Sequence, residues 1–176
     1  MTNNITVKID GTDITSQVRY PTLDTLSRSF SDSDRCTMEV SSLDNISLSP
    51  LTECEVIDGD KIIFGGTLSN HRITTDSINK TYSLEFTDWS EKLRTVTIIR
   101  ERYANVPITY ILLNLFSKYA PEFQVIIDDS RTVGEIVFKQ QSLMEAVEEL
   151  QDDFRLDWFI TPDKTIYFFK ELKDLS

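Results

Sequence analysis

The sequence predicts a mainly β protein: a small antiparallel β-barrel or sandwich, followed by an α+β part with two helices. Two observations predict this order. Up to about residue 98, short segments alternate apolar and polar residues between turn residues, as antiparallel strands over one core do. Farther along, two longer segments carry apolar residues at helical spacing. We therefore expect an antiparallel β-barrel-like domain over residues 1–98 and an α+β domain over residues 99–176.

Each expected strand of the first domain has one apolar and one polar face. The alternating apolar residues are Val7 and Ile9; Cys36, Met38 and Val40; Cys54 and Val56; and Tyr82, Leu84 and Phe86. Asp58-Gly59 predicts a hairpin turn into the next strand, Lys61–Phe64. Gly65-Gly66 follows directly and predicts a bulge or sharp bend, because no phosphate-loop spacing accompanies it.

The first expected helix has Pro107 at its first position, where proline is favoured, and Pro121 ends it. Two short strands are expected after this helix, at Val125–Ile127 and Glu135–Phe138. The face of the helix expected to be buried is formed by Ile108, Ile111, Leu112, Leu115 and Phe116.

The second expected helix has Ser142 as its N-cap, because Ser142 and Glu145 form a capping-box pattern. One of its faces is apolar and the other is acidic. A hairpin of two strands, Leu156–Ile160 and Thr165–Phe169, is expected to follow. The aromatic residues are expected mainly in the core, with an exposed platform for sugar stacking as the alternative. Those beside helix or strand signals are Trp89, Trp158, Phe159, Phe168 and Phe169.

The charge of the chain restricts its partners. The formal net charge is −11 and the pI is about 4.5, which argues against a nucleic-acid-binding groove lined by Lys and Arg. An acidic wall would let DNA pass without binding to it, but on charge alone solubility is the better explanation. The longest apolar stretch, Ile108–Phe116, is too short to cross a bilayer, and the N-terminus has no secretory signal, so no membrane insertion is expected.

The sequence contains few residues that could form a catalytic or metal-binding site. Cys36, Cys54 and His71 are too few and too scattered for a zinc site, and the cysteines are expected to be buried thiols in a reducing compartment. His71 has no catalytic-triad context, and the acidic pairs Asp128-Asp129 and Asp152-Asp153 are expected on the solvated surface. We therefore predict no catalytic, cofactor-binding or metal residues, no cofactor, and a protein that is not an enzyme.

Three stretches, taken together and in order, resemble a known family. The first stretch, Ile62–Leu68 (IIFGGTL), is similar to a strand of the pattern apolar-Phe-x-Gly-x-Ile/Leu. The second stretch, Tyr82–Arg94, is similar to a segment in which Asp-Tyr/Trp is followed by Leu-x-Arg. Ser142–Phe169 is similar to a helix followed by a Trp-containing hairpin. The pattern resembles the N-terminal region of phage tail hub proteins. That family includes the baseplate hub of contractile tails, late control protein D-like proteins and tail-associated proteins of long flexible tails.

The resemblance implies a structural component of a virion, assembled in the cytoplasm of the bacterial host, with a tail-tube-like barrel. Such hub proteins form a trimeric ring at the distal end of the tail tube, an assembly that can require the full-length protein. The ring joins the tube or a distal tail ring to a spike or fibre, and lets the tape-measure protein and DNA pass. Whether the tail is contractile, and how many subunits the ring has, stay open.

Two other functions remain as alternatives. A carbohydrate- or receptor-binding β module of a tail would carry an exposed aromatic cluster. A cell-wall glycan hydrolase would need two carboxyl groups facing each other in a cleft.

Overall fold

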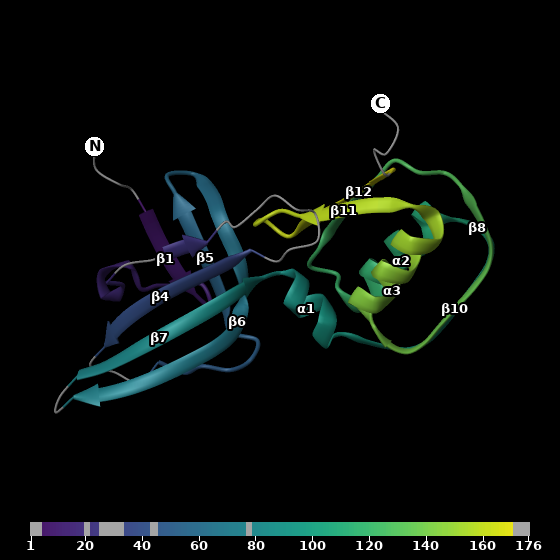
Figure 1. Ribbon diagram of the computed structural model, residues 1–176. Coiled ribbons are helices and arrows are strands. Elements are labelled where there is room, and N and C mark those ends of the chain that lie inside the picture. The colour runs from purple at the N-terminus through teal and green to yellow at the C-terminus, as the bar shows by residue number, and fades with distance from the viewer. Residues whose placement is uncertain (1–4, 20–21, 25–33, 43–45, 77–78, 171–176) are drawn as a thin grey trace. The chain divides into compact units, whose positions relative to one another are not determined.

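The computed structural model describes residues 5–19, 22–24, 34–42, 46–76 and 79–170. The chain forms two compact units, Met1–Lys92 and Leu93–Ser176, which we call the N-terminal and C-terminal units (Figure 1). The predicted fold class is confirmed: the N-terminal unit is built from strands, and the two longer helices, α2 and α3, belong to the second part. The division into domains at residue 98 stays a prediction.

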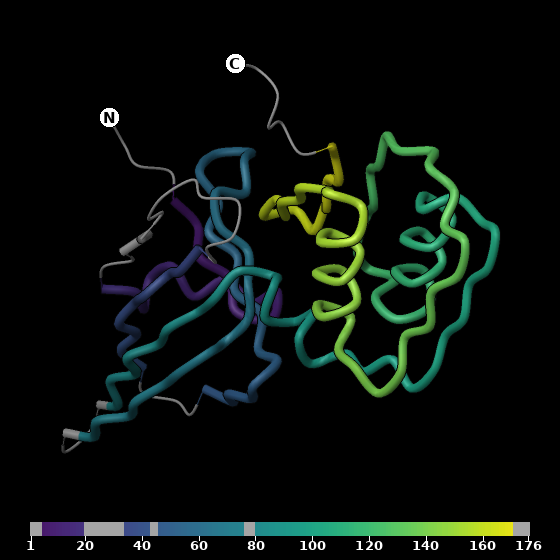
Figure 2. The backbone as a smooth tube through the Cα atoms, turned by 45° about the vertical axis from the view of Figure 1, so that its right-hand side comes forward, coloured from purple at the N-terminus to yellow at the C-terminus, as the bar shows by residue number. Residues whose placement is uncertain are grey.

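The N-terminal unit contains one curled antiparallel sheet (Figures 1 and 2). Across the sheet, the order of its seven strands is β2-β1-β5-β6-β7-β4-β3. Their bounds are β1 (Ile5–Ile9), β2 (Thr12–Asp13), β3 (Thr22–Asp24), β4 (Arg35–Ser42), β5 (Glu53–Asp58), β6 (Lys61–Asp76) and β7 (Asn79–Asp88). The predicted hairpin is confirmed, because Asp58 pairs with Lys61 across a turn in which Gly59 has a φ of 61°.

One segment of the chain occupies both edges of this sheet. After β1 the chain turns back, so that β2 pairs with β1. Past the 3-10 turn η1 (Thr15–Gln17), Val18 pairs with Val40, and the Arg19 amide donates to the Glu39 carbonyl at 2.8 Å. β3 then pairs with β4. The curled sheet is therefore a half-barrel whose two edges, β2 and β3, come from the same segment of the chain.

The core of the N-terminal unit lies inside the curl. Every alternating apolar residue predicted for this unit is at most 4% exposed, and Trp89 is fully buried. The predicted irregularity at Gly65-Gly66 lies beside the glycines, since the strand register shifts between Val56 and Ile57 and between Leu68 and Asn70.

The C-terminal unit combines two helices with two small sheets. Its elements are β8 (Thr97–Pro107), α2 (Ile108–Tyr119), β9 (Gln124–Ile127), β10 (Thr132–Ser142), α3 (Leu143–Phe154), β11 (Leu156–Ile160) and β12 (Thr165–Lys170), and α1 (Ser90–Thr95) precedes them. β8 and β10 form a two-stranded antiparallel ribbon that curves around the helices (Figures 1 and 2). β12 pairs with β11 antiparallel and with β9 parallel.

Both predicted helices are confirmed, and each has the expected buried face. Pro107 is the N-cap of α2 rather than its first helical residue. The capping box of α3 is present: the Glu145 amide donates to Ser142 Oγ at 3.1 Å, and the Ser142 amide donates to Glu145 Oε2 at 2.6 Å. The predicted strand Glu135–Phe138 is only the middle of β10, and β8 was not predicted.

Candidate functional site

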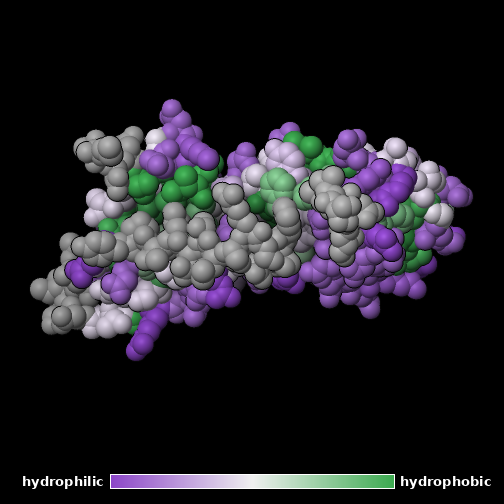
Figure 3. Space-filling view, turned by 45° about the horizontal axis from the view of Figure 1, so that its top comes forward, coloured by the Kyte–Doolittle hydropathy of each residue, from purple (hydrophilic) through white to green (hydrophobic). Residues whose placement is uncertain are grey.

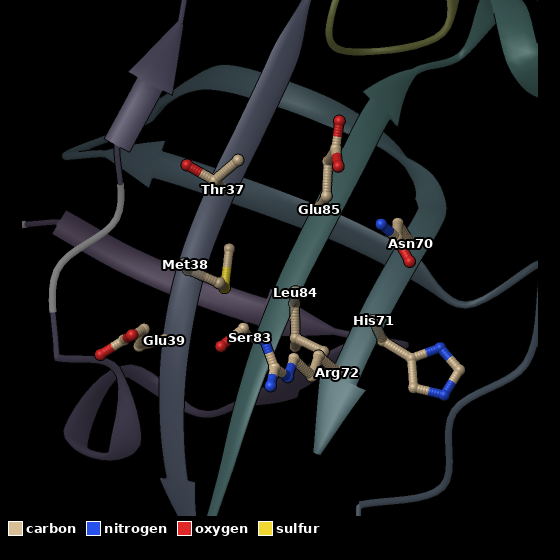
Figure 4. Close-up of a pocket in the computed structure, with 9 residues that line it drawn as sticks. All are labelled: Thr37, Met38, Glu39, Asn70, His71, Arg72, Ser83, Leu84 and Glu85. Atoms are coloured by element: carbon tan, nitrogen blue, oxygen red, sulfur yellow. The ribbon is translucent and has the colours of Figure 1, made fainter. Parts of the chain in front are cut away.

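An open polar pocket of about 500 Å³ lies on the face of β4, β7 and β6 that points away from the core (Figure 4). Strand register places its side chains in two rows across the three strands. One row is Thr37, Glu85 and Asn70, and the other is Glu39, Ser83 and Arg72. This face can form hydrogen bonds and ion pairs with a partner surface.

The pocket does not assemble a catalytic triad. His71 pairs with Leu84, whose side chain is buried in the core, so His71 belongs to the face opposite Ser83 and Glu85. Its ring points away from them in Figure 4. A general acid is kept protonated by burial, whereas Glu39 is exposed and Glu85 forms a 3.4 Å ion pair with Arg35. The geometry suits recognition of another surface better than catalysis.

Asp88 organises the end of β7 through its carboxylate. Oδ2 accepts a hydrogen bond from the Asp34 amide at 2.9 Å, and Oδ1 accepts from the Ser90 amide at 2.9 Å, next to the start of α1. Burial, and then the charge of Asp88, raise the pKa of Asp34. The Asp88-Trp89-Ser90 part of the family-like stretch thus has a structural role in this chain.

Asp129 corrects the expectation that both members of the Asp128-Asp129 pair are solvated. Its side chain is fully buried and is held by Arg131, with Nε 2.8 Å from Oδ2. The hydrogen bonds from Arg131 lower the pKa of Asp129. Arg131 also lies over the ring of Phe154 at 5.8 Å. This ion pair anchors the loop before β10 and contributes no reactive group.

A polar cluster joins α2 to β8. Glu101 accepts hydrogen bonds from Lys118 and, at 2.7 Å, from the Tyr119 hydroxyl, and these bonds lower the pKa of Glu101. The Tyr103 hydroxyl donates to Asn114 Oδ1 at 2.8 Å, and burial raises the pKa of Tyr103. The phenol therefore stays protonated, and the cluster fixes the helix against the strand.

Most of the described aromatic residues are buried, as expected, and Phe159 is an exception. It is 38% exposed and stacks on Tyr167, with ring centroids 4.9 Å apart. Strand register continues this row to Ile126, which is 41% exposed, and Phe169 lies beside Phe159 at 6.0 Å. In the view of Figure 3, hydrophobic patches interrupt the hydrophilic surface of both units. The outer face of the β11-β12-β9 sheet is thus one apolar surface available for contact.

Cys36 and Cys54 are both fully buried free thiols, as expected. A hydrogen bond with Cys36 raises the pKa of Cys54, with burial as the second cause. Among the residues that the structure describes, no three His, Cys, Asp or Glu side chains are grouped to hold a metal ion. None of the helices described has the length and apolar character needed to span a membrane.

Several solved structures share this fold. The 43 kDa tail protein of prophage MuSo2 from Shewanella oneidensis matches with a TM-score of 0.73 and 15% identity, over 97% of this chain and 56% of that one. A tail protein from Neisseria meningitidis matches with a TM-score of 0.65 and 14% identity, over 93% of this chain and 49% of that one.

An E. coli component of the type VI secretion system, described as similar to the T4 bacteriophage tail proteins gp27 and gp5, also matches. Its TM-score is 0.61 at 10% identity, over 90% of this chain and 51% of that one. This chain therefore spans about half the length of these neighbours. No protein-family model and no curated protein matches the sequence. The resemblance predicted from the sequence is confirmed at the level of the fold, which is that of phage and prophage tail proteins.

Proposed function

We propose that this chain is a structural component of a phage or prophage tail, at the baseplate hub or tail tip, and is related to the late control protein D-like hub proteins. In this function it forms a ring with copies of itself, trimeric in the family it resembles. The ring lies at the distal end of the tail tube and joins the tube to the spike or fibre. The tape-measure protein and DNA pass through its bore.

The observation that carries this proposal is the fold, which tail proteins share over at least 93% of this chain and a type VI secretion component over 90%. The pocket supports it, because an open polar face on three strands is suited to contact with another protein. The net charge of −11 also supports it, because an acidic wall repels phosphate and lets DNA pass.

Self-association of the full-length protein is tested by size-exclusion chromatography with light scattering. We expect a defined oligomer of identical subunits. A strict monomer that also fails to bind the neighbouring tail proteins would contradict the ring.

The position in the particle is tested by electron microscopy of particles that carry an epitope-tagged copy, labelled with an antibody. We expect label at the end of the tail that is distal to the head. Label on the head, or label spread along the tube, would contradict a tail-tip position.

The row formed by Phe159 and Tyr167 favours a second candidate function, a carbohydrate- or receptor-binding module. Aromatic rings exposed on a sheet can stack on sugars. Glycan-array binding that is lost in Phe159→Ser, while the oligomer persists, would support this function in place of the first. A zymogram tests the hydrolase alternative, since cell-wall cleavage abolished by Glu39→Gln or Glu85→Gln would overturn a purely structural role.

A further inference from the structure

The outer face of the β8–β10 ribbon carries positive charge in an acidic chain. Arg100 lies directly opposite Lys139 across the two strands, and Arg102 follows on the same face of β8. Like charges directly opposite each other destabilise an antiparallel pair. Arg102 is neutralised by Glu135, with 2.9 Å between Nη2 and Oε1, whereas Arg100 and Lys139 have no ion-pair partner in the described chain. The ribbon therefore has two unbalanced positive charges side by side.

Apolar side chains accompany these charges. Val137, opposite Arg102 on the same face, is 36% exposed, and Ile99, the neighbour of Arg100 along β8, is 76% exposed, the largest value among the large hydrophobic residues that the structure describes. Arginine beside exposed apolar side chains is typical of protein–protein interfaces. A nucleic-acid surface needs a denser group of cations, because each phosphate contact uses one of them. A protein surface with negative charge is the partner that this face fits.

The C-terminal unit also carries a surface of the opposite sign. Asp152 and Asp153 are exposed in the last turn of α3, which has no basic residue. Carboxylates are unfavourable at the negative end of a helix dipole. Other acids of α3 are satisfied: Glu148 lies 3.6 Å from Arg94, and Glu149 accepts a hydrogen bond from Gln141. Neither Asp152 nor Asp153 has an ion-pair partner among the described residues.

These two surfaces do not meet within one copy. The inner face of the ribbon, with Tyr103, Ile136 and Phe138, is buried in the unit that contains α2 and α3. The outer face, with Arg100 and Lys139, therefore points away from those helices. A second molecule with the opposite charge at each place would therefore add a favourable interaction to both surfaces.

We propose that the basic face of the ribbon in one copy docks on the acidic last turn of α3 in the next copy. Arg100 and Lys139 face Asp152 and Asp153 across this contact, and Val137, on the same face of the ribbon, is buried in it. A contact between two different surfaces of identical chains is head-to-tail, and such contacts generate a ring when the rotation closes. The inference rests on the proposed function, for which it supplies the subunit contact.

Charge reversal tests the contact by analytical ultracentrifugation of the protein as its gene encodes it. Arg100→Glu/Lys139→Glu and Asp152→Lys/Asp153→Lys should each lower the association constant by about tenfold or more, because each places like charges across the interface. The variant that combines all four substitutions restores opposite charges and should return to within about threefold of the wild type. Arg19→Glu/Lys61→Glu, which reverses two exposed cations of the N-terminal unit, is the matched control and should leave association unchanged.

The single variant Arg100→Glu distinguishes loss of the contact from loss of folding. This substitution places an acidic side chain opposite Lys139, so the variant should unfold at an equal or higher urea concentration while its association weakens. A residue with only a structural role would change both measurements in the same direction.

The outcomes distinguish this contact from the proposed function. Self-association that is insensitive to both double variants, or that the fourfold variant fails to restore, would overturn the contact and leave the ring standing. A wild-type protein that is monomeric at every concentration would overturn both. Binding of duplex DNA that Arg100→Glu/Lys139→Glu abolishes, with association unchanged, would also overturn the contact and assign the ribbon to nucleic acid.

Discussion

A Cβ atom at position 66 would lie 2.1 Å from the carbonyl oxygen of Thr87. Gly66 is on β6 and pairs with Asp88 at the end of β7, where the two backbones approach closely. Directly after this point Asp88 binds the Asp34 and Ser90 amides, and Trp89 is buried. The glycine is thus required by the close approach of backbone atoms, which cannot move aside as a flexible side chain can.

We predict that Gly66→Ala lowers the free energy of unfolding by about 3 kcal/mol, because the added methyl group overlaps backbone atoms of β7. The measurement is urea unfolding followed by circular dichroism, with the midpoint falling and the slope unchanged. Gly134→Ala is the control, since a Cβ there meets nothing within 4 Å, and it should change the free energy by no more than about 0.5 kcal/mol. Equal midpoints for the two variants would contradict the steric argument.

The capping box of α3 supports a second prediction. Ser142→Ala removes the oxygen that accepts the Glu145 amide, and should destabilise the protein by about 1 kcal/mol. Ser142→Asp keeps an acceptor at the N-cap and should recover most of the loss. Both variants are measured by urea unfolding. A neutral Ser142→Ala variant would mean that tertiary packing alone fixes the start of α3.

Alternation made the strands of the N-terminal unit predictable, because one face of each strand is buried and a side-chain period of two then appears in the sequence. β8 does not show this period. Asn105 of β8 and Gln140 of its partner β10 have positive φ values of 53° and 49°. At each of these residues the next partly buried position lies three residues after a buried one, instead of two. Charged residues also fill the middle of β8, from Arg100 to Arg102. The sequence therefore shows no strand signal there.

The candidate surfaces were less predictable than the fold, since each depends on neighbours that only strand pairing brings together. Asp129 and Asp128 are equivalent in the sequence, and only the packing against Arg131 distinguishes the buried one. Phe159 has the local pattern of a core residue, but its strand turns it to the outer face. Arg100 and Lys139 are far apart in the chain, and their repulsion appears only in the ribbon register.

The buried Asp129 gives a prediction about acid. Hydrogen bonds from Arg131 lower its pKa below the ordinary value of 3.8, so its ionised form stabilises the folded state above pH 4. This contribution is lost as the pH falls below 3.8 through the lowered pKa. We expect Asp129→Asn to cost about 2 kcal/mol at pH 7, less than for a fully buried pair because Arg131 is partly exposed, and progressively less below pH 4.

The measurement for Asp129→Asn is the difference in unfolding free energy from the wild type between pH 2.5 and pH 7. Asp128→Asn, at the exposed neighbouring position, should differ from the wild type by about 0.5 kcal/mol or less throughout. A cost for Asp129→Asn that does not vary with pH would show that its carboxylate charge is not what stabilises the loop.

The paired thiols give a prediction about reactivity. The hydrogen bond with Cys36 and burial raise the pKa of Cys54 above its ordinary 9.0, and the thiolate is the reactive form of cysteine. Native protein at pH 8 should therefore react with a thiol-specific reagent only at the rate of unfolding, and both thiols should react at once in urea. Ser130→Cys, at an exposed position, is the control and should add one thiol that reacts immediately.

The same raised pKa has a consequence at alkaline pH. Because the folded state keeps Cys54 protonated, its contribution to stability is complete below pH 9 and is lost as the pH rises beyond that value. Unfolding free energy should thus fall more steeply above pH 9 in the wild type than in Cys54→Ala, which has no thiol to titrate there. Parallel pH profiles for the two proteins, or rapid reaction of both native thiols at pH 8, would mean that the interior of the sheet is open to solvent.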